Sequence, residues 1–540
     1  MKTVAQYMAE TLKSLGVKYV FGIPSGNWVD YLEAIREVDG IEFILVSNES
    51  SAGFMADVCW RLTGQVAACF GTFGPGACNL STGVCGAYLD RSPMLVFTDE
   101  MDEKMRPRIT QMNIDHQKLF EPITKWTGRI EINKVKETIY KAHQIALSEV
   151  PGPTHIGLPA GMGLLETIDQ ELSFLHPNKT PKADYSTLAE MKRHFNNAQK
   201  PIIALGITSI RLDVQSLILK IVEKFKIPVV LTPMAKGMIS EDHSSYVGVL
   251  GHALGNIIGQ THQQADLVIG IGYDPIELNY EDWMPNVPLI HMDTTPADLD
   301  TENYILACDV VGDLNHSLEY LLSIERFQNE WDFDELADRK EKMFAKLAAP
   351  EGSFGPRKVI EALRVILPQN GIMTCDVGAH LHLIGQQWKT PSPECQLMTN
   401  GCSSMGFGIP AAIAAKLICP ERKVCCVVGD GGYYMMAGEM ATAMRLNLDI
   451  VFVVLTDAEL SLITIKQKNK NNAHYGTSLH AENVGYESSN FMFGVPILIA
   501  KNAKEYEGAL EKAFNEKGPF IIEASIDPQE YEKLVLKGNK

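Results

Sequence analysis

The segment that decides the fold is Lys423-Val424-Cys425-Cys426-Val427-Val428-Gly429-Asp430-Gly431-Gly432. Its apolar first half has the length of one buried strand, and its glycine-rich end precedes a predicted helix over 436–446. A turn of this kind in a parallel sheet places free amides and side chains at the carboxyl edge, where α/β folds bind ligands. The segment therefore predicts an α/β fold with an anion-binding turn at 429–432.

The next apolar run, Ile450 to Leu455, leads to a second carboxylate at the same predicted edge. Asp457 follows this run and lies 27 residues after Asp430, a separation that suits one strand–helix–strand unit. Two carboxylates beside a phosphate-binding turn suit a hard cation such as Mg²⁺. Each fragment alone is as well explained by a plain turn and, for Asp457, by a helix N-cap. Their combination favours a metal and diphosphate site.

Strand-like runs alternate with helical patterns along all 540 residues. Two stretches break the alternation: the polar stretch 166–186 and the charged stretch 325–346. We therefore expect three doubly wound parallel-sheet domains, near 1–170, 187–325 and 350–540. The predicted strands are 19–23, 42–46, 201–206, 228–232, 265–272, 288–293, 371–377, 423–428 and 450–455.

Composition excludes several classes of protein. Lys plus Arg is 48 against 66 for Asp plus Glu, a net charge of −18, which disfavours nucleic acid and anionic membranes as partners. No apolar run has the length of a membrane helix, and residues 1–17 lack the apolar core of a signal peptide. The 11 cysteines form no paired zinc pattern and are expected to be free thiols. These features predict a cytoplasmic enzyme.

Glu49 is the candidate catalytic carboxyl in the first block. It follows the apolar run 43–46, precedes a helix of small residues at 50–57, and is followed by Arg61-Leu62-Thr63-Gly64. Position alone is equally consistent with an ordinary glutamate in the first turn of a helix. Three further motifs occur at predicted strand-to-helix turns: Gly71-Thr72-Phe73-Gly74-Pro75-Gly76-Ala77-Cys78-Asn79, Asp376-Val377-Gly378-Ala379-His380 and Met405-Gly406-Phe407-Gly408.

Together these motifs resemble those of the thiamine-diphosphate-dependent enzymes, and the chain is most similar to acetolactate synthases. The resemblance implies that Asp430, Asp457 and the main-chain carbonyl of Glu459 bind the divalent metal. The family usually has an Asn where this chain has Asp457, and the catabolic, flavin-independent acetolactate synthases look similar in carrying Asp. Glu49 would activate the cofactor by exchanging a proton with its aminopyrimidine ring.

The resemblance assigns further residues to the cofactor and the substrate. Gln111 would face the reacting centre, and His116 is a candidate proton carrier or a solvated surface histidine. Met405 would wedge between the two cofactor rings, and His380 would contact the terminal phosphate. The expected cofactor-binding residues are Glu49, Gly74, Asn79, Gly378, His380, Met405, Asp430, Gly431 and Gly432.

The implied reaction is decarboxylation of a 2-oxo acid, with pyruvate favoured, and carboligation to a second oxo compound. Phe73 and Ala160 depart from acetolactate synthases, so a simple decarboxylase or another acyloin-forming lyase is the alternative. A non-catalytic cofactor-binding subunit is the third hypothesis, and retention of Glu49 argues against it. FAD is not favoured, because Gly270-Ile271-Gly272 does not continue as a dinucleotide motif. The resemblance also implies a homodimer or homotetramer with active sites between subunits.

Overall fold

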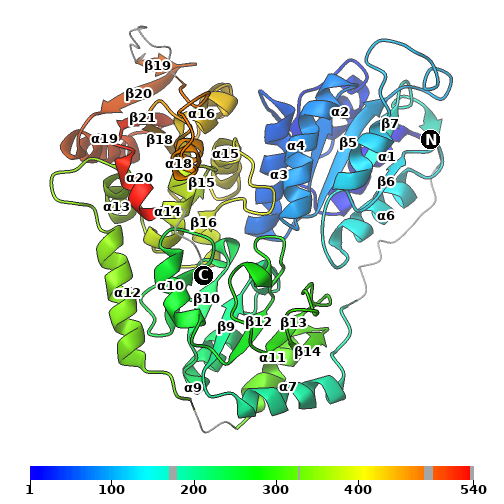
Figure 1. Ribbon diagram of the computed structural model, residues 1–540. Coiled ribbons are helices and arrows are strands. Elements are labelled where there is room, and N and C mark those ends of the chain that lie inside the picture. Colours follow the sequence, from blue (N-terminus) through cyan, green and yellow to red (C-terminus); the bar gives the residue numbers. More distant parts are fainter. Residues whose placement is uncertain (169–178, 326–328, 480–489, 536–540) are drawn as a thin grey trace.

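The computed structural model describes residues 1–168, 179–325, 329–479 and 490–535, and it contains three parallel sheets. Figure 1 shows the first unit in blue to cyan, the second in green and the third in yellow to red. Each sheet is covered by helices on its faces, so the predicted fold of three α/β units is confirmed. Among the described residues, no helix is long and apolar enough to cross a membrane.

The first sheet has the order β3-β2-β4-β5-β7-β6, and all its strand pairs are parallel. A short antiparallel pair, β1 with β8, lies outside it. The strands are β1 (Lys2–Thr3), β2 (Tyr19–Gly22), β3 (Glu42–Leu45), β4 (Ala67–Gly71), β5 (Met94–Glu100), β6 (Thr127–Arg129), β7 (Thr154–Pro159) and β8 (Glu166–Thr167). The helices are α1 (Val4–Ser14), α2 (Val29–Arg36), α3 (Glu49–Thr63), α4 (Pro75–Leu89), α5 (His116–Phe120), the 3₁₀ turn η1 (Glu121–Ile123) and α6 (Val135–Leu147).

The second sheet has the order β11-β10-β9-β12-β13-β14, again parallel throughout. The strand order reverses between β9 and β12, which is the switch point of a doubly wound sheet. The strands are β9 (Pro201–Leu205), β10 (Val229–Leu231), β11 (Tyr246–Val249), β12 (Leu267–Ile271), β13 (Leu289–Asp293) and β14 (Leu306–Val311). The helices are α7 (Tyr185–Asn197), α8 (Ile207–Arg211), α9 (Gln215–Phe225), α10 (Gly255–His262), α11 (Leu314–Ser323) and the 3₁₀ turns η2 (Pro233–Ala235) and η3 (Tyr280–Asp282).

The third sheet has the order β16-β15-β17-β18-β21-β20-β19, and only the β19–β20 pair is antiparallel. The strands are β15 (Ile372–Cys375), β16 (Gln396–Leu397), β17 (Val424–Gly429), β18 (Ile450–Thr456), β19 (Phe491–Met492), β20 (Val495–Ala500) and β21 (Phe520–Ser525). The helices are α12 (Phe333–Leu347), α13 (Pro356–Ile366), α14 (Ala379–Gln387), α15 (Gly408–Ile418), α16 (Asp430–Met436), α17 (Glu439–Arg445), α18 (Ser461–Asn469), α19 (Ala503–Asn515), α20 (Gln529–Leu534) and the 3₁₀ turn η4 (Pro393–Cys395).

Two details differ from the sequence prediction. The helix predicted over 436–446 is two shorter helices, because α16 already begins at Asp430 and ends before Ala437 and Gly438. Most of the charged stretch 325–346, read as a break between domains, is the helix α12, which runs along the outside between the second and third units (Figure 1). Its buried Leu336, Met343 and Leu347 recur at helical spacing. The many charged residues between them had hidden this pattern from the sequence prediction.

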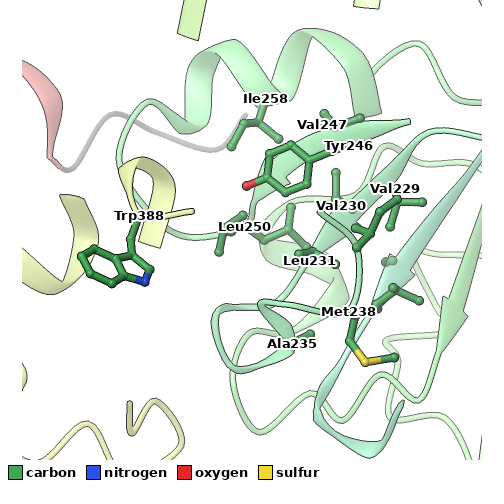
Figure 2. Packing of buried hydrophobic residues seen from close by; sticks show 14 of the residues in the cluster. Val229, Val230, Leu231, Ala235, Met238, Tyr246, Val247, Leu250, Ile258 and Trp388 are labelled. Atoms are coloured by element: carbon green, nitrogen blue, oxygen red, sulfur yellow. The ribbon is translucent and has the colours of Figure 1, made fainter. Parts of the chain in front are cut away.

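The three units share their cores. Figure 2 shows Trp388, from the end of α14 in the third unit, beside the buried residues of β10 and β11 in the second. Between the first and third units, Phe54 of α3 meets Phe407 edge to face, with ring centroids 5.7 Å apart. Arg61, at the end of α3, binds Asp57 and Asp90 and donates to the carbonyl of Met398. The packing therefore fixes the sheet edges of the first and third units relative to each other.

Glu277 is a half-buried residue near the junction of the three units. Its oxygens accept hydrogen bonds from the Thr232 hydroxyl at 2.6 Å and the Met234 amide at 2.8 Å. Burial raises the pKa of Glu277 to about 8; those two hydrogen bonds lower it, and the charges of Asp90 and Asp274 raise it further. The carboxyl is therefore protonated in the folded chain near neutral pH.

We expect Glu277 to make the protein less stable as pH rises. The unfolded side chain loses its proton near its ordinary pKa of ~4.3, whereas the folded one keeps it to about 8. Between these values the folded state binds more protons, so each increase in pH favours unfolding. Glu277→Gln removes this difference, and its melting temperature relative to wild type should rise by ~2 °C or more between about pH 5.5 and pH 8.5.

Thermal unfolding at both pH values checks this, with the exposed Glu302→Gln as the control. An equal difference between Glu277→Gln and wild type at the two pH values would contradict the prediction.

Candidate functional site

The carboxyl edge of the third sheet brings the two predicted metal-binding carboxylates together. β17 and β18 are neighbours, with Gly429 paired to Leu455, so Asp430 and Asp457 follow adjacent strands. The Asp430 carboxylate accepts hydrogen bonds from the amides of Asp457 at 3.2 Å and Ala458 at 2.8 Å. The sequence prediction that the two aspartates return to one edge is therefore met by the geometry.

Asp457 has the electrostatics of a carboxylate that lacks a counter-charge. Its oxygens accept hydrogen bonds from the Ser461 hydroxyl and the Glu459 amide. Burial raises its pKa to about 7, and the charge of Asp430 adds to this rise. A divalent cation between the two carboxylates would favour their ionised forms. No three acidic, histidine or cysteine side chains converge on one point in the described part of the chain. Main-chain and phosphate oxygens would have to complete the coordination.

His380 and three glycines form the adjoining part of this edge. His380 lies in the first turn of α14, is 4% exposed and has no hydrogen-bond partner at Nε2. A Cβ on Gly429 would stand 3.5 Å from its ring, and one on Gly378 would stand 2.8 Å from it. An unpartnered ring nitrogen beside exposed backbone at two helix starts fits an anionic phosphate. Gly378, His380, Asp430 and Gly431 are thus brought together, as predicted.

Asp376 is a buried residue of this edge to which we had assigned no role. Its carboxylate accepts hydrogen bonds from the amides of Gly406, Phe407 and Gly408, at distances from 2.9 to 3.4 Å. It therefore ties the end of β15 to the loop that carries Met405. A Cβ on Gly432 would stand 1.9 Å from the same carboxylate. Position 432 therefore has to be glycine, because any side chain there would collide with the Asp376 carboxylate. The glycine-rich motif by itself does not reveal this reason.

Gly432→Ala should destabilise the third unit by about 3 kcal/mol, because its methyl group has no room beside the Asp376 carboxylate. Gly508→Ala is the matched control: it lies in the helix α19 with nothing within 4 Å of its Cβ. This control should be neutral or stabilise by about 1 kcal/mol. Denaturant unfolding of the two variants measures the difference. Equal stability of Gly432→Ala and wild type would show that the close approach is wrong.

Met405 lies against the carboxyl edge of the third sheet, near Asp430. A Cβ on Gly431 would stand 3.1 Å from the Met405 methyl group and 2.8 Å from a methyl group of Leu460. Met405 thus reaches the turn that carries Asp430, which is the neighbourhood expected of a side chain that wedges between cofactor rings. Glu459, the third predicted metal ligand, follows Ala458 on the same loop and forms an isolated bridge with Ser478.

Glu49 lies at the carboxyl edge of the first sheet. It is the first residue of α3, is 6% exposed and accepts a hydrogen bond from the Asn79 side chain at 3.0 Å. A Cβ on Gly76 would stand 3.2 Å from its other carboxylate oxygen, so the glycine turn lies close to this carboxylate. Gly74, in the same turn, has φ 44°, a left-handed conformation that favours glycine. The predicted pair Glu49 and Asn79 is therefore in direct contact.

Glu439 is a second residue that sequence reasoning missed. It is fully buried in α17, and its carboxylate accepts hydrogen bonds from the amides of Ser47 and Asn48 at 3.0 and 3.1 Å. Asn48 is the N-cap of α3, so Glu439 of the third unit fixes the backbone that presents Glu49. No local signal could have identified Glu439, because its burial arises from contact with another unit.

Gln111 and His116 lie in and after the loop that follows β5. Gln111 is exposed on this loop. His116 is 2% exposed and accepts a hydrogen bond from the Gly74 amide at 3.2 Å, so the alternative of a solvated surface histidine is wrong. It is held against the Gly74 turn of the first unit rather than in solvent.

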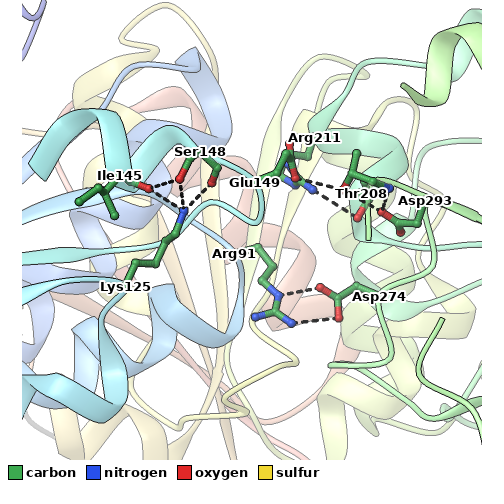
Figure 3. Close-up of polar contacts among 10 residues, drawn as sticks. Arg91, Lys125, Ile145, Ser148, Glu149, Thr208, Arg211, Asp274 and Asp293 are labelled. Carbon is green, nitrogen blue, oxygen red and sulfur yellow. Dashed lines mark hydrogen bonds and ion pairs between the residues drawn. The ribbon is translucent and has the colours of Figure 1, made fainter. Parts of the chain in front are cut away.

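The switch point of the second sheet lies against the first unit. Figure 3 shows that ion pairs from the first unit reach this edge: Arg91 to Asp274, and Glu149 to Arg211. A Cβ on Gly206, at the end of β9, would stand only 2.6 Å from a carbonyl oxygen at the end of β12. The helix that follows, α8, has five residues. These contacts join the first and second units at the carboxyl edge of the second sheet.

Three family descriptions match the chain in order. Residues 2–119 match "Thiamine pyrophosphate enzyme, N-terminal TPP binding domain". Residues 188–321 match the central domain of the same enzymes, and residues 376–524 match their C-terminal TPP binding domain. Each match falls within one of the three sheet-containing units.

Similar proteins match over almost the whole chain. A probable acetolactate synthase large subunit of Methanococcus aeolicus is 28% identical, over 99% of this chain and 94% of that protein. An acetolactate synthase of Bacillus subtilis is 28% identical, over 97% of this chain and 93% of that protein. The large subunit of acetolactate synthase isozyme 1 of Escherichia coli is also 28% identical, over 98% and 94%.

Proposed function

Since the chain belongs to the thiamine pyrophosphate enzymes, we propose that it decarboxylates a 2-oxo acid and joins the remaining fragment to a second oxo compound. Pyruvate is the favoured donor, because the relatives named above are acetolactate synthases. The observation that carries the proposal is the buried carboxyl of Glu49, bonded to Asn79 in the first unit. Binding a cofactor alone does not require this carboxyl.

At the third sheet, the proposed roles follow from position. Asp430, Asp457 and the carbonyl of Glu459 would hold Mg²⁺, whose charge offsets that of the two carboxylates and the diphosphate. His380, Gly378, Gly431 and Gly432 would line the diphosphate, and Met405 would separate the two rings of the cofactor. Their support is the shared edge of β15, β17 and β18, with the unpartnered Nε2 of His380 beside it.

At the first sheet, Glu49 would exchange a proton with the aminopyrimidine ring, and Gly74 and Asn79 would line the pocket. When bound, thiamine diphosphate supplies the electron sink for decarboxylation. The chain's own contribution is to bury Glu49 and orient it through Asn79. Gln111, exposed beside this pocket, would contact the substrate.

The oligomeric state is part of the proposal. Glu49 and Asp430 belong to different sheets, and both regions carry exposed apolar side chains, including Ile109 and Met112 in the first unit and Met435 in the third. A second copy of the chain would cover such surfaces and bring a first unit against a third. We therefore propose a homodimer, or a homotetramer built from it, in the cytoplasm. The proposed domains span 1–170, 187–325 and 350–540.

Product analysis tests the proposed function. Purified protein with thiamine diphosphate and Mg²⁺ is supplied with pyruvate, alone and with an added aldehyde, and the products are separated. Acetolactate is the expected product. Acetaldehyde alone, or a mixed acyloin, would assign the chain to a decarboxylase or another lyase instead. Absence of CO₂ release from pyruvate and from a panel of other 2-oxo acids would overturn the enzymatic function.

A further inference from the structure

His116 is the first side chain in a series of hydrogen bonds that starts at the turn beside Glu49. Its Nε2 accepts the Gly74 amide at 3.2 Å, and its Nδ1 lies 2.8 Å from the Thr98 hydroxyl. Thr98 in turn lies 2.8 Å from Nε2 of His155. All three side chains of this part are at most 2% exposed. Gly74 is therefore linked through His116 to side chains from β5 and β7, in the middle of the first sheet.

The series of hydrogen bonds continues beyond His155 to an ion pair. His155 Nδ1 lies 2.6 Å from the Thr127 hydroxyl, which donates to the Gln117 carbonyl at 2.7 Å. The amide of Gln117 donates to Glu100, and Arg129 pairs with the same carboxylate. We call these six side chains, together with His116, the buried relay: Thr98, Glu100, His116, Gln117, Thr127, Arg129 and His155.

The direction of every hydrogen bond in the buried relay is determined by its two ends. A backbone amide can only donate, so Nε2 of His116 is unprotonated and Nδ1 carries the proton that Thr98 accepts. The Thr98 hydroxyl then donates to His155, whose own proton goes to the other side. From the opposite end, an ionised Glu100 can only accept, which orients Gln117 and gives the same direction. The relay therefore admits one tautomer of each histidine.

The surroundings keep both histidines neutral. Burial lowers the pKa of His116 to about 4. Burial and the nearby His116 lower the pKa of His155 well below its usual value. A second proton on His116 would face the Gly74 amide with a donor, so the neutral ring is also the form that the geometry requires. Near neutral pH the buried relay is thus a fixed support and carries no charge at its Gly74 end.

The turn held by His116 lies close to Glu49. Gly74 starts the turn in a left-handed conformation, with φ 44°, and a Cβ on Gly76 would stand 3.2 Å from the Glu49 carboxylate. A Cβ on Gly74 would stand 2.9 Å from the carbonyl oxygen of Met112, so the same turn supports the loop that carries Gln111. A shift of this turn would move one wall of the Glu49 pocket and the loop together.

We propose that His116 is a positioning residue that sets the Gly74–Gly76 turn against Glu49 through the Gly74 amide, with Thr98 and His155 fixing its tautomer. This inference rests on the proposed function in so far as Glu49 activates the cofactor. It assigns His116 no proton transfer: the residue supports Glu49 without contacting the cofactor.

Amide exchange in the cofactor-free protein is the first test, because it does not depend on activity. His116→Phe fills the volume but leaves Gly74 without its acceptor. Deuterium uptake measured by mass spectrometry should therefore rise at least ~10-fold in rate for the peptide that contains Gly74. Thr98→Val, which removes the next link, should raise it by a smaller factor. His116→Gln offers an amide oxygen within reach of Gly74 and should restore much of the protection.

Cofactor affinity and turnover are measured on the same variants. The Kd for thiamine diphosphate at saturating Mg²⁺ is measured by fluorescence quenching, and we expect it to rise ~10-fold in His116→Phe. We also expect kcat to fall more in His116→Phe than in Thr98→Val. Thr154→Val is the matched control, because its buried hydroxyl lies on the same strand as His155 but bonds to the Ala142 carbonyl at 3.2 Å. It should lose similar thermal stability and keep the wild-type exchange and affinity.

Two results would overturn the proposal: wild-type Gly74 exchange and cofactor affinity in His116→Phe, or equal losses in Thr98→Val and Thr154→Val. If His116→Phe does not fold, Thr98→Val and His116→Gln still decide the question. If the wild type releases no CO₂, the proposed function fails while exchange and cofactor affinity still test His116.

Discussion

Glu49→Gln is expected to lower the rate of CO₂ release by ~10³-fold at saturating thiamine diphosphate and Mg²⁺. The substitution keeps the shape of the side chain and an oxygen that can accept the hydrogen bond of Asn79. It removes the ability to exchange a proton, which the proposed activation of the aminopyrimidine ring requires. Because the side chain is buried at the start of α3, no solvent carboxylate can replace it.

The measurement is CO₂ release, together with the Kd for thiamine diphosphate from fluorescence quenching. The Kd should change by less than about 10-fold, so that the loss lies in kcat. Glu42→Gln is the matched control: it is the same substitution at an exposed position in β3, the strand that leads toward Glu49, and it should retain wild-type activity. Retention of a tenth or more of the wild-type rate by Glu49→Gln would falsify the assigned role.

Much of the third sheet was predictable because its signals are local. The run 424–428 is apolar at every position, the strand predicted from it is 423–428, and the strand observed is Val424–Gly429. Asp430 and Asp457 follow two such runs, and a strand–helix–strand connection returns both to one edge. The single helix predicted between them is divided at Ala437 and Gly438 into α16 and α17. The sequence pattern did not reveal this division, because the apolar residues on both sides keep a helical spacing.

The residues that sequence reasoning missed act across distance. The Asp376 carboxylate accepts hydrogen bonds from backbone amides some 30 residues further along the chain. The Glu439 carboxylate accepts them from backbone amides in another unit. The sequence around a polar residue does not show which hydrogen-bond donors will surround it once it is buried. The burial of His116 was equally unpredictable, because a lone histidine in a polar segment gives no sign of burial. Its environment depends on the packing of α5 against β5 and β7.

The junction between the first and third units of one chain holds α3, and with it Glu49, in a fixed position. Arg61 ties α3 to the loop after β16 through the Met398 carbonyl, and Gly401 donates to Asp90 at the end of α4. The same loop leads to Met405, whose methyl group would stand 3.1 Å from a Cβ on Gly431. Glu439 and Arg61 thus connect the two ends of α3 to the third unit, and α3 begins with Glu49.

Asp430→Ala is expected to raise the Mg²⁺ concentration needed to retain thiamine diphosphate by ~100-fold, equivalent to about 2.7 kcal/mol. Asp430 offers a carboxylate at the shared edge and also accepts the amides of Asp457 and Ala458, so its loss removes a metal ligand and loosens the loop that carries the second. Asp457→Ala should have a smaller effect of ~10-fold, because it removes one carboxylate and leaves the loop bonded to Asp430. Asp457→Asn keeps a side-chain oxygen and should lie closer to wild type.

Cofactor retention on gel filtration, measured over a range of Mg²⁺ concentrations, separates these variants. Asp449→Ala is the control, because Asp449 immediately precedes the opposite end of β18 and binds the Gly518 amide and Lys517 there. It should bind Mg²⁺ and cofactor like the wild type even where it lowers thermal stability. Unchanged Mg²⁺ dependence in both Asp430→Ala and Asp457→Ala would mean that the metal lies elsewhere. A large effect in Asp430→Ala alone would mean that Asp457 shapes the loop without binding the cation.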